Sequence, residues 1–322
     1  MKILRKILFR GLLPMLLMIL VQPTAKAQGH YAGSSFNPND YFIPPVSGWV
    51  FALYYSYTNM NYYNGAGKKA DVIQLSQNPP LNIAVGQQAV THSAIPMFIR
   101  FGKGKILNAN WGYLVLPMFN NPNANMALDY YLGQTNVGSQ SMKFNSFGLG
   151  DMYIQPVWLT WEKKKLSTTF SYGVWLPVGK YEPNSTDNIG MGYWSHNFRV
   201  ANRYKPSAQY SIMGALTLEV NSQQKGNDFK EAPHLAFDFG GSYSFPKGHE
   251  VGLMGYGQWQ LGEDQGSKAT LPQDRIYSLG TYGAYWIKPG KLSVLGRFNY
   301  NFGARNRFAG LSFQLGINFL LM

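Results

Sequence analysis

Residues 233–245 read PHLAFDFGGSYSF, a stretch in which bulky apolar side chains alternate with small or polar ones. In an extended chain, successive side chains point to opposite faces. Leu235, Phe237 and Phe239 therefore share one face, while Asp238 lies on the other. A strand with one aromatic face and one polar face separates two different environments. This stretch predicts a β-structure whose wall is apolar on one side and wet on the other.

The same alternation recurs along most of the chain, for example in residues 208–220 and 291–303. We expect an all-β fold of about twelve strands, at residues 48–58, 90–101, 105–117, 146–161, 165–177, 190–205, 207–220, 233–246, 249–261, 274–288, 291–303 and 308–321. These strands are longer than the five or six residues usual in soluble proteins. An even number of strands of ~9–11 residues or more is typical of a transmembrane antiparallel up-and-down β-barrel.

The predicted connections alternate in length along the chain. Short links are expected at 102–104, 162–164, 205–206, 246–248 and 288–290, and longer ones at 59–89, 118–145, 178–189, 221–232 and 262–273. Short turns on one side and long loops on the other are the outer-membrane pattern. The short links carry lysines, which suit either anionic lipid head groups or simple solvation of a tight turn.

Composition favours a surface that faces something other than water. Only 13% of the residues are charged, against about 25% in soluble domains, and 16% are aromatic. A soluble β-sandwich is the alternative, but the second face of the predicted strands stays polar instead of forming an apolar core. The chain has no cysteine, which excludes disulfides, thiolate metal ligands and a lipid-modified cysteine.

The N-terminal segment has the features of a signal peptide. Four cationic residues within the first ten precede an apolar run and the small-x-small pattern Ala25-Lys26-Ala27. We predict that residues 1–27 are cleaved, that the mature chain starts at Gln28, and that the protein is located in the outer membrane. Without the five cations of this segment, a net charge of +8 remains of the +13 and is spread along the chain, which argues against a nucleic-acid partner.

Residues 28–47 have neither helical nor strand periodicity and precede a barrel expected at 48–322. They contain aromatic residues, among them Tyr41 and Phe42, between Asn, Pro and Gly. Two arrangements stay open: the segment could fold into the lumen as a plug, or it could extend into the periplasm as a tether.

The polar faces of the predicted strands should line the lumen. The residues expected there are Asp151, Gln155, Arg199, Glu219, Asp238, Gln258, Arg297, Asn299, Asn301 and Gln314, with Gln260 and Asn318 on the same faces. Both signs of charge are interspersed with amides. This mixture fits a wetted conduit with weak polar selectivity, or else a lumen packed shut by ion pairs. We favour a narrow channel, since twelve strands lie between sealed eight-stranded and open sixteen-stranded barrels.

Several blocks resemble the family of outer-membrane proteins named for the meta-pathway of phenol degradation. The most specific block is GLGDMYIQPVWL at 148–159, and PPVSGW at 44–49, PVGKY at 177–181, GYW at 192–194 and FGARNR at 302–307 also match. The resemblance runs from about Asn39 to the C-terminus. It implies a transporter barrel associated with gene clusters for aromatic catabolism, without an agreed set of functional residues.

No pattern of catalytic residues is evident. His249 lacks a second histidine four residues on, where Leu253 stands, so the zinc-protease motif fails. Ser195 and His196 are adjacent and should point to opposite faces of a strand, which argues against a barrel-embedded lipid hydrolase. We predict that the protein is not an enzyme and has no catalytic, cofactor or metal site.

The sequence therefore predicts an outer-membrane, porin-like channel or transporter for small molecules. An aromatic or hydrophobic preference rests on the resemblance alone. The alternative is a structural or surface-binding barrel without transport, and a lipid hydrolase comes third. The expected partners are outer-membrane lipid, lipopolysaccharide and small-molecule solutes, while the oligomeric state stays open.

Overall fold

The computed structural model describes residues 30, 37–183, 185, 187–266 and 274–321, so the predicted signal peptide at 1–27 lies outside the described residues. The described strands are β1 Gly48–Tyr63, β2 Ala70–Gln77, β3 Pro80–Phe101, β4 Asn110–Leu116, β5 Phe119–Leu132, β6 Thr135–Asn145, β7 Gly148–Leu149, β8 Met152–Lys163, β9 Leu166–Leu176, β10 Ser195–Tyr204, β11 Tyr210–Asn221, β12 His234–Ser244, β13 Glu250–Gln260, β14 Arg275–Lys288, β15 Leu292–Arg305 and β16 Arg307–Leu321. Two short 3-10 helices are η3 Pro38–Tyr41 and η4 Pro246–Gly248.

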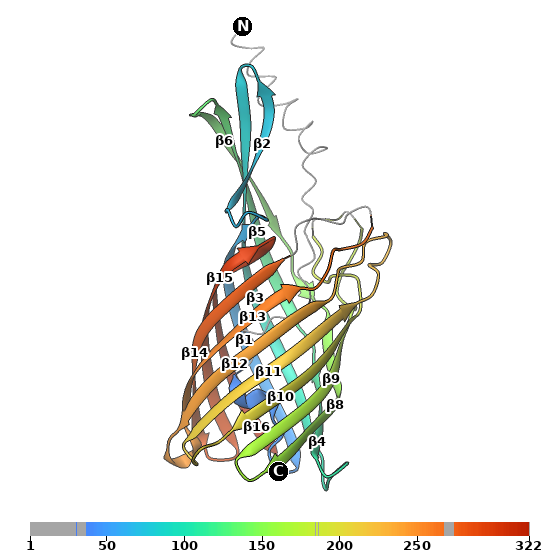
Figure 1. Ribbon diagram of the computed structural model, residues 1–322, viewed down its shortest axis with the longest axis vertical. Helices are drawn as coiled ribbons and strands as arrows, with labels where there is room; N and C mark the ends of the chain where they lie inside the picture. Colours follow the sequence, from blue (N-terminus) through green and yellow to red (C-terminus); the bar gives the residue numbers. More distant parts are fainter. Residues whose placement is uncertain (1–29, 31–36, 184, 186, 267–273, 322) are drawn as a thin grey trace.

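Twelve strands, β1, β3, β4 and β8–β16, close into an antiparallel barrel (Figure 1). The barrel closes at β1, which pairs with β16 on one side and β3 on the other. Ala52 of β1, for example, lies opposite both Asn318 and Met97. The predicted fold class, a transmembrane antiparallel up-and-down β-barrel of twelve strands, is confirmed, and each predicted strand has a counterpart.

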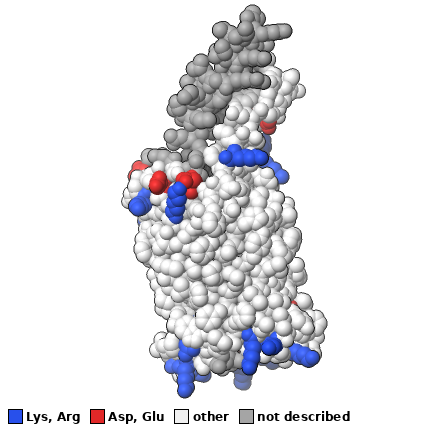
Figure 2. All heavy atoms as spheres, turned by 180° about the vertical axis from the view of Figure 1, so that it is seen from behind, with Lys and Arg blue, Asp and Glu red and all other residues white. Residues whose placement is uncertain are grey.

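The alternation seen in the sequence separates the two faces of the wall. In β12, Phe237 and Phe239 are about two-fifths exposed, whereas their neighbours Ala236 and Asp238 are buried. Figure 2 shows the result on one side of the molecule: the outside of the barrel is free of charged side chains between two charged rims. An uncharged band of this kind suits the hydrocarbon interior of a bilayer.

The two ends of the barrel differ in their connections. At the short-turn end, consecutive strands are joined by tight links such as η4, and at the long-loop end by longer segments such as 177–194 and 222–233. The tight links carry the exposed lysines Lys103, Lys164, Lys205, Lys247 and Lys288, and cationic side chains ring this end in Figure 2. β16 ends here as well (Figure 1).

Segments 59–89 and 118–145, which were predicted as loops, are largely strands. These segments contain the end of β1, all of β2 and β6, the first part of β3 and all of β5. Strands β2, β3, β5 and β6 pair in that order into an antiparallel sheet that projects from the long-loop end (Figure 1). A small cluster including Ile83, Met126 and Leu128 is buried in this projecting sheet. The prediction was wrong because strands outside a bilayer need no aromatic face, and Asn- and Gln-rich strands resemble loops in composition.

β3 belongs to both the barrel and the projecting sheet. Residues 98–101 of β3 pair with β4, and residues 81–94 pair with β5. β4 and β5 follow each other in the chain and are separated only by Pro117 and Met118. Along the described residues, no helix has the length and apolar character needed to cross a bilayer.

Candidate functional site: the barrel interior

The ten residues predicted to line the lumen all lie on the inward face of the wall. Each is at most 5% exposed: Asp151, Gln155, Arg199, Glu219, Asp238, Gln258, Arg297, Asn299, Asn301 and Gln314. Gln260 is buried and Asn318 half-buried on the same faces. Their chain neighbours on the opposite face include exposed aromatic residues such as Phe198 and Phe298. Whether the ten side chains border an open conduit stays a prediction.

Residues 37–43 lie inside the barrel, where Figure 1 shows η3 surrounded by strands. Tyr41, Phe42 and Ile43 are each at most 4% exposed. The backbone of this segment binds β8: the Trp158 indole N–H donates to the Tyr41 carbonyl at 3.0 Å, and the Ile43 N–H donates to Thr160 Oγ1 at 3.0 Å. The aromatic residues of this segment are therefore packed against the inner wall.

Two arginines of β10 stack on these aromatic rings. The Arg199 guanidinium lies 4.6 Å from the Tyr41 ring centroid, and the Arg203 guanidinium lies 4.4 Å from that of Phe42. A cation over an aromatic face is attracted by the ring quadrupole, more strongly where water is excluded. Arg203 also donates to Asn39 Oδ1 at 2.9 Å. One strand thus contacts three residues of the segment, Asn39, Tyr41 and Phe42.

A second set of contacts ties the segment to β15 and β13. Arg297 forms an ion pair with Asp40 and donates to Asn37 Oδ1 at 2.7 Å. Asn39 donates to both carboxylate oxygens of Glu250 at 2.7 Å. Hydrogen bonds to charged groups are roughly twice as strong as neutral ones. Residues 37–43 are therefore held from two sides of the barrel.

Nearer the long-loop end, His30 contacts β9, β10 and the link that precedes β8. Its ring nitrogens are hydrogen-bonded to Ser195 Oγ at 2.6 Å and to Asp151 Oδ2 at 2.7 Å, and the ring stacks on Trp175. The Ser195 hydroxyl also donates to Asn221 Oδ1 at 2.6 Å. Ser195 and His196 point to opposite faces as expected, but the structure provides a different histidine for Ser195.

A cavity of about 180 Å³ lies in the barrel interior beside His30. Its lining is mostly apolar and comes from the loops and from strands all around the wall except β11–β14. The apolar and aromatic residues are Tyr54, Ile95, Met97, Leu116, Met118, Tyr153, Trp175, Ile189 and Met191, and the polar ones are His30, Asn120, Asp151, Asn197, Arg199, Arg297 and Gln314. Four of the ten predicted lumen residues border it: Asp151, Arg199, Arg297 and Gln314.

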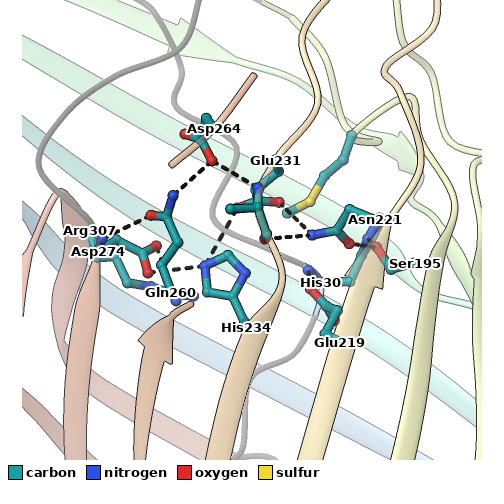
Figure 3. A network of polar contacts seen from close by, with 12 residues as sticks. His30, Ser195, Glu219, Asn221, Glu231, His234, Gln260, Asp264, Asp274 and Arg307 are labelled. Carbon is teal, nitrogen blue, oxygen red and sulfur yellow. Dashed lines mark hydrogen bonds and ion pairs between the residues drawn. The ribbon is translucent and has the colours of Figure 1, made fainter. Parts of the chain in front are cut away.

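A buried polar network that includes His30 lies at the long-loop end (Figure 3). Glu231, in the loop between β11 and β12, accepts a hydrogen bond from the Tyr193 hydroxyl. Burial raises the pKa of the Glu231 carboxyl to about 7, because a charged carboxylate loses hydration there. His234 lies 3.0 Å from Asp274, which pairs with Arg307 at 3.3 Å.

Sequence reasoning missed several of these interior residues. His30 contacts Asp151 and Ser195, which lie 121 and 165 residues away in the sequence. The segment around His30 has no periodicity, and nothing in it predicted these partners. Glu231 lies in a loop, outside the alternation that identified the lumen residues. His234 is at an inward position of β12, so the alternation alone could have found it.

Comparison with known proteins places this fold among outer-membrane barrels. The chain is similar to an outer-membrane channel from Pseudomonas putida F1, with 12% identity and a TM-score of 0.64 over 89% of this chain and 100% of that one. It is also similar to the monoaromatic hydrocarbon channel CymD, with 10% identity and a TM-score of 0.45 over 90% and 92% of the two chains. No curated protein sequence matches the chain.

One family model matches residues 76–317, which run from the end of β2 through most of β16. The blocks at 148–159, 177–181 and 302–307 fall within this region. Because the match spans most of the chain, the protein belongs to the family described as "Putative MetA-pathway of phenol degradation".

Proposed function

We propose that the protein is an outer-membrane channel that lets small, largely apolar molecules, single-ring aromatics among them, pass through the barrel interior. The observation that carries the proposal is the cavity beside His30. Its lining is mostly apolar, with three methionines among the side chains and polar groups interspersed. An apolar cavity of roughly 150 Å³ is enough to bind benzene. At about 180 Å³, this cavity has room for one aromatic ring.

Methionines are suited to a passage for several related solutes. Met97, Met118 and Met191 border the cavity, and their unbranched, polarizable side chains adapt to ligands of different shape. The family description and the likeness in fold to an outer-membrane channel agree with this proposal. The charged groups at the border, Arg199, Arg297 and Asp151, have protein partners. A neutral solute therefore suits the cavity better than an ion.

Residues 37–43 act, in this proposal, as a plug that narrows the path toward the short-turn end. Their aromatic side chains pack beneath Arg199 and Arg203, and Asp40 binds Arg297. Of the two arrangements left open by the sequence, these contacts support the plug. Solutes would then pass beside the segment or after it moves, so steady-state conductance to ions should be low.

Flux of phenol into liposomes tests the channel with a matched pair of variants. Met97 borders the cavity, while Phe98, the next residue of β3, is exposed on the outer face. Met97→Trp should fill the cavity and reduce phenol flux several-fold, whereas Phe98→Trp should leave it near the wild-type value. Phenol uptake by cells at low external concentration should also fall when the gene is deleted. Equal flux through protein-free and protein-containing liposomes would contradict transport.

The competing function is a surface-binding barrel, which the projecting sheet β2-β3-β5-β6 favours because it extends beyond the barrel (Figure 1). Deleting residues 70–89 and 120–145 separates the two functions. A channel should keep its phenol flux without the sheet, while a surface-binding barrel should lose its ligand. A catalytic function has less support: Ser195, the candidate nucleophile of a hydrolase, is fully buried, and its hydroxyl donates a hydrogen bond to Asn221 Oδ1.

Export through a cleaved signal peptide is part of the same proposal. The mature chain should begin at Gln28 and fractionate with the outer membrane, together with lipopolysaccharide and phospholipid. N-terminal sequencing of the purified protein checks this directly, and an intact Met1 would contradict it.

A further inference from the structure

Three buried side chains at the long-loop end offer ligand atoms of the kinds that bind metal ions. They are Glu219 at the end of β11, Glu231 in the following loop and His234 at the start of β12. One carboxylate oxygen or ring nitrogen from each lies within 4.8 Å of the other two. All three residues are at most 2% exposed. Two carboxylates are rarely buried this closely together unless a positive charge compensates them.

His234 is held in the way that metal-bound histidines usually are. Its Nε2 lies 3.0 Å from Asp274 Oδ1 and 3.9 Å from Glu231 Oε1, and the other oxygen of Asp274 lies 3.3 Å from the Arg307 guanidinium. Histidine ligands almost always give their second ring nitrogen to a carboxylate or carbonyl, which fixes the tautomer and the orientation of the ring. With its proton on Nε2, His234 keeps a lone pair on Nδ1.

The Nδ1 atom of His234 has no hydrogen-bond partner among the described residues, although the residue is only 1% exposed. A buried polar atom without a partner costs free energy, so its presence calls for an explanation. In Figure 3, Asp274 and Glu219 lie on opposite sides of the imidazole ring. Nε2 is bound to Asp274, so Nδ1 lies on the side of the ring that is nearer Glu219.

The carboxylates are also oriented by neighbouring donors. Asn197 donates to Glu219 Oε2 at 2.9 Å and the His30 N–H donates to Glu219 Oε1 at 3.0 Å, while the Tyr193 hydroxyl and the Asn221 amide donate to Glu231 Oε2. A carboxylate offers about four acceptor positions, so each oxygen of Glu219 and the Oε1 atom of Glu231 still have a lone pair for an ion. Donors that orient a carboxylate while leaving lone pairs free are the usual surroundings of a metal ligand.

We propose that Glu219, Glu231 and His234 bind a divalent first-row transition-metal ion such as Zn²⁺. One imidazole nitrogen with carboxylate oxygens is a ligand set that Zn²⁺ accepts, and three protein ligands leave a position for water. Atoms within 4.8 Å of one another lie at most about 2.8 Å from a common point, so shifts of about 0.7 Å reach the ~2.1 Å of a zinc site. The ion would cross-link β11 and β12 through the loop between them.

Zinc binding to the purified full-length protein tests the proposal. After dialysis against a chelator, addition of Zn²⁺ and gel filtration, elemental analysis should find one zinc per chain. Glu231→Gln is nearly isosteric and should lose this zinc. His196→Ala is the control, because His196 lies on the next strand but faces outward, where it contacts Tyr172. Retention in the control, together with loss in Glu231→Gln, assigns the zinc to the buried cluster and not to His196.

Asp274→Asn provides a second, milder variant that keeps all three ligands. Loss of an outer partner typically weakens metal affinity about 10–100-fold, so competition with a chromophoric chelator should show a shift of that size. Heat-modifiable migration on gels checks that each variant is folded. The proposal is overturned if the wild-type chain retains no zinc, or if Glu231→Gln and Asp274→Asn bind it as tightly as wild type.

Discussion

The two faces of the barrel wall are built from neighbouring residues yet follow different physical rules. On the outer face, side chains such as Phe237 and Leu216 stand largely exposed and have no polar partners to satisfy. On the inner face, Arg297 and Glu219 are buried in a dense set of hydrogen bonds and ion pairs. The outer face therefore tolerates any apolar shape, whereas the inner face depends on specific partners.

This difference shows which face of the barrel wall requires particular residues. A lipid-facing residue interacts with a solvent that adapts to it, so its contribution depends on polarity and depth in the bilayer. An inward residue interacts with fixed groups, and removing one partner leaves another unsatisfied. Substitutions of adjacent residues should therefore separate the two faces, with a polarity effect outside and a partner effect inside.

The largest effect is expected from a cation on the outer face. Phe237→Arg should lower the free energy of unfolding by about 2–4 kcal/mol if the position lies near mid-bilayer, because lipid gives a cation no hydration. Asp238→Asn, one residue along and 3% exposed, keeps the shape of the side chain and should cost less. Urea unfolding in lipid vesicles measures both. If Asp238→Asn proved the more damaging, the assignment of the faces would be reversed.

A smaller loss is expected when the inner face loses a partner of the N-terminal segment. Arg297→Met removes the contacts to Asp40, Asn37 and Gln314 and should cost about 1.5–3 kcal/mol, the range for hydrogen bonds to a charged group. Phe298→Met, on the outer face beside it, should change stability little. Protease digestion in detergent supplies a second readout: residues 37–47 should become cleavable in the first variant and stay protected in the second.

The smallest effect concerns the rim of the short-turn end, which belongs to neither face. Lys247 and Lys288 are exposed there and could contact anionic head groups, each such contact being worth about 1 kcal/mol at most. Replacing both by Gln should destabilise the barrel in vesicles with anionic lipid but not in zwitterionic ones, and salt should abolish the difference. Equal stability in both kinds of vesicle would mean that these lysines only solvate the turns.

The strands of the wall could be predicted because one physical constraint acts on all of them. A bilayer outside and a polar interior impose a period of two, and Asp238 and Gln258, on the polar face of this alternation, are buried. The projecting sheet has no bilayer around it, so β2 and β6 lack that signal and were expected as loops. Alternation thus reports the environment of a strand as much as the strand itself.

Most of the candidate site could not be predicted because its contacts join residues far apart in the sequence. Asp40 and Arg297 are separated by 257 residues, and neither local sequence predicts a contact with the other residue. The burial of Phe42 depends on Arg203 in the same way. Composition identified residues 28–47 as aperiodic and aromatic, but the choice between plug and tether needed the positions of the arginines.

The contacts of His30 and Phe42 place these two residues at different depths of the barrel interior. His30 binds Ser195 and Phe42 lies against Arg203, eight residues further along β10, or about 26 Å at 3.3 Å per residue. Twelve wall strands return the chain to the end where the first strand began, so His30, near the long-loop end, and Leu321, at the short-turn end, lie at opposite ends of the barrel. Labels at these two positions, read alone, would suggest an odd number of strands.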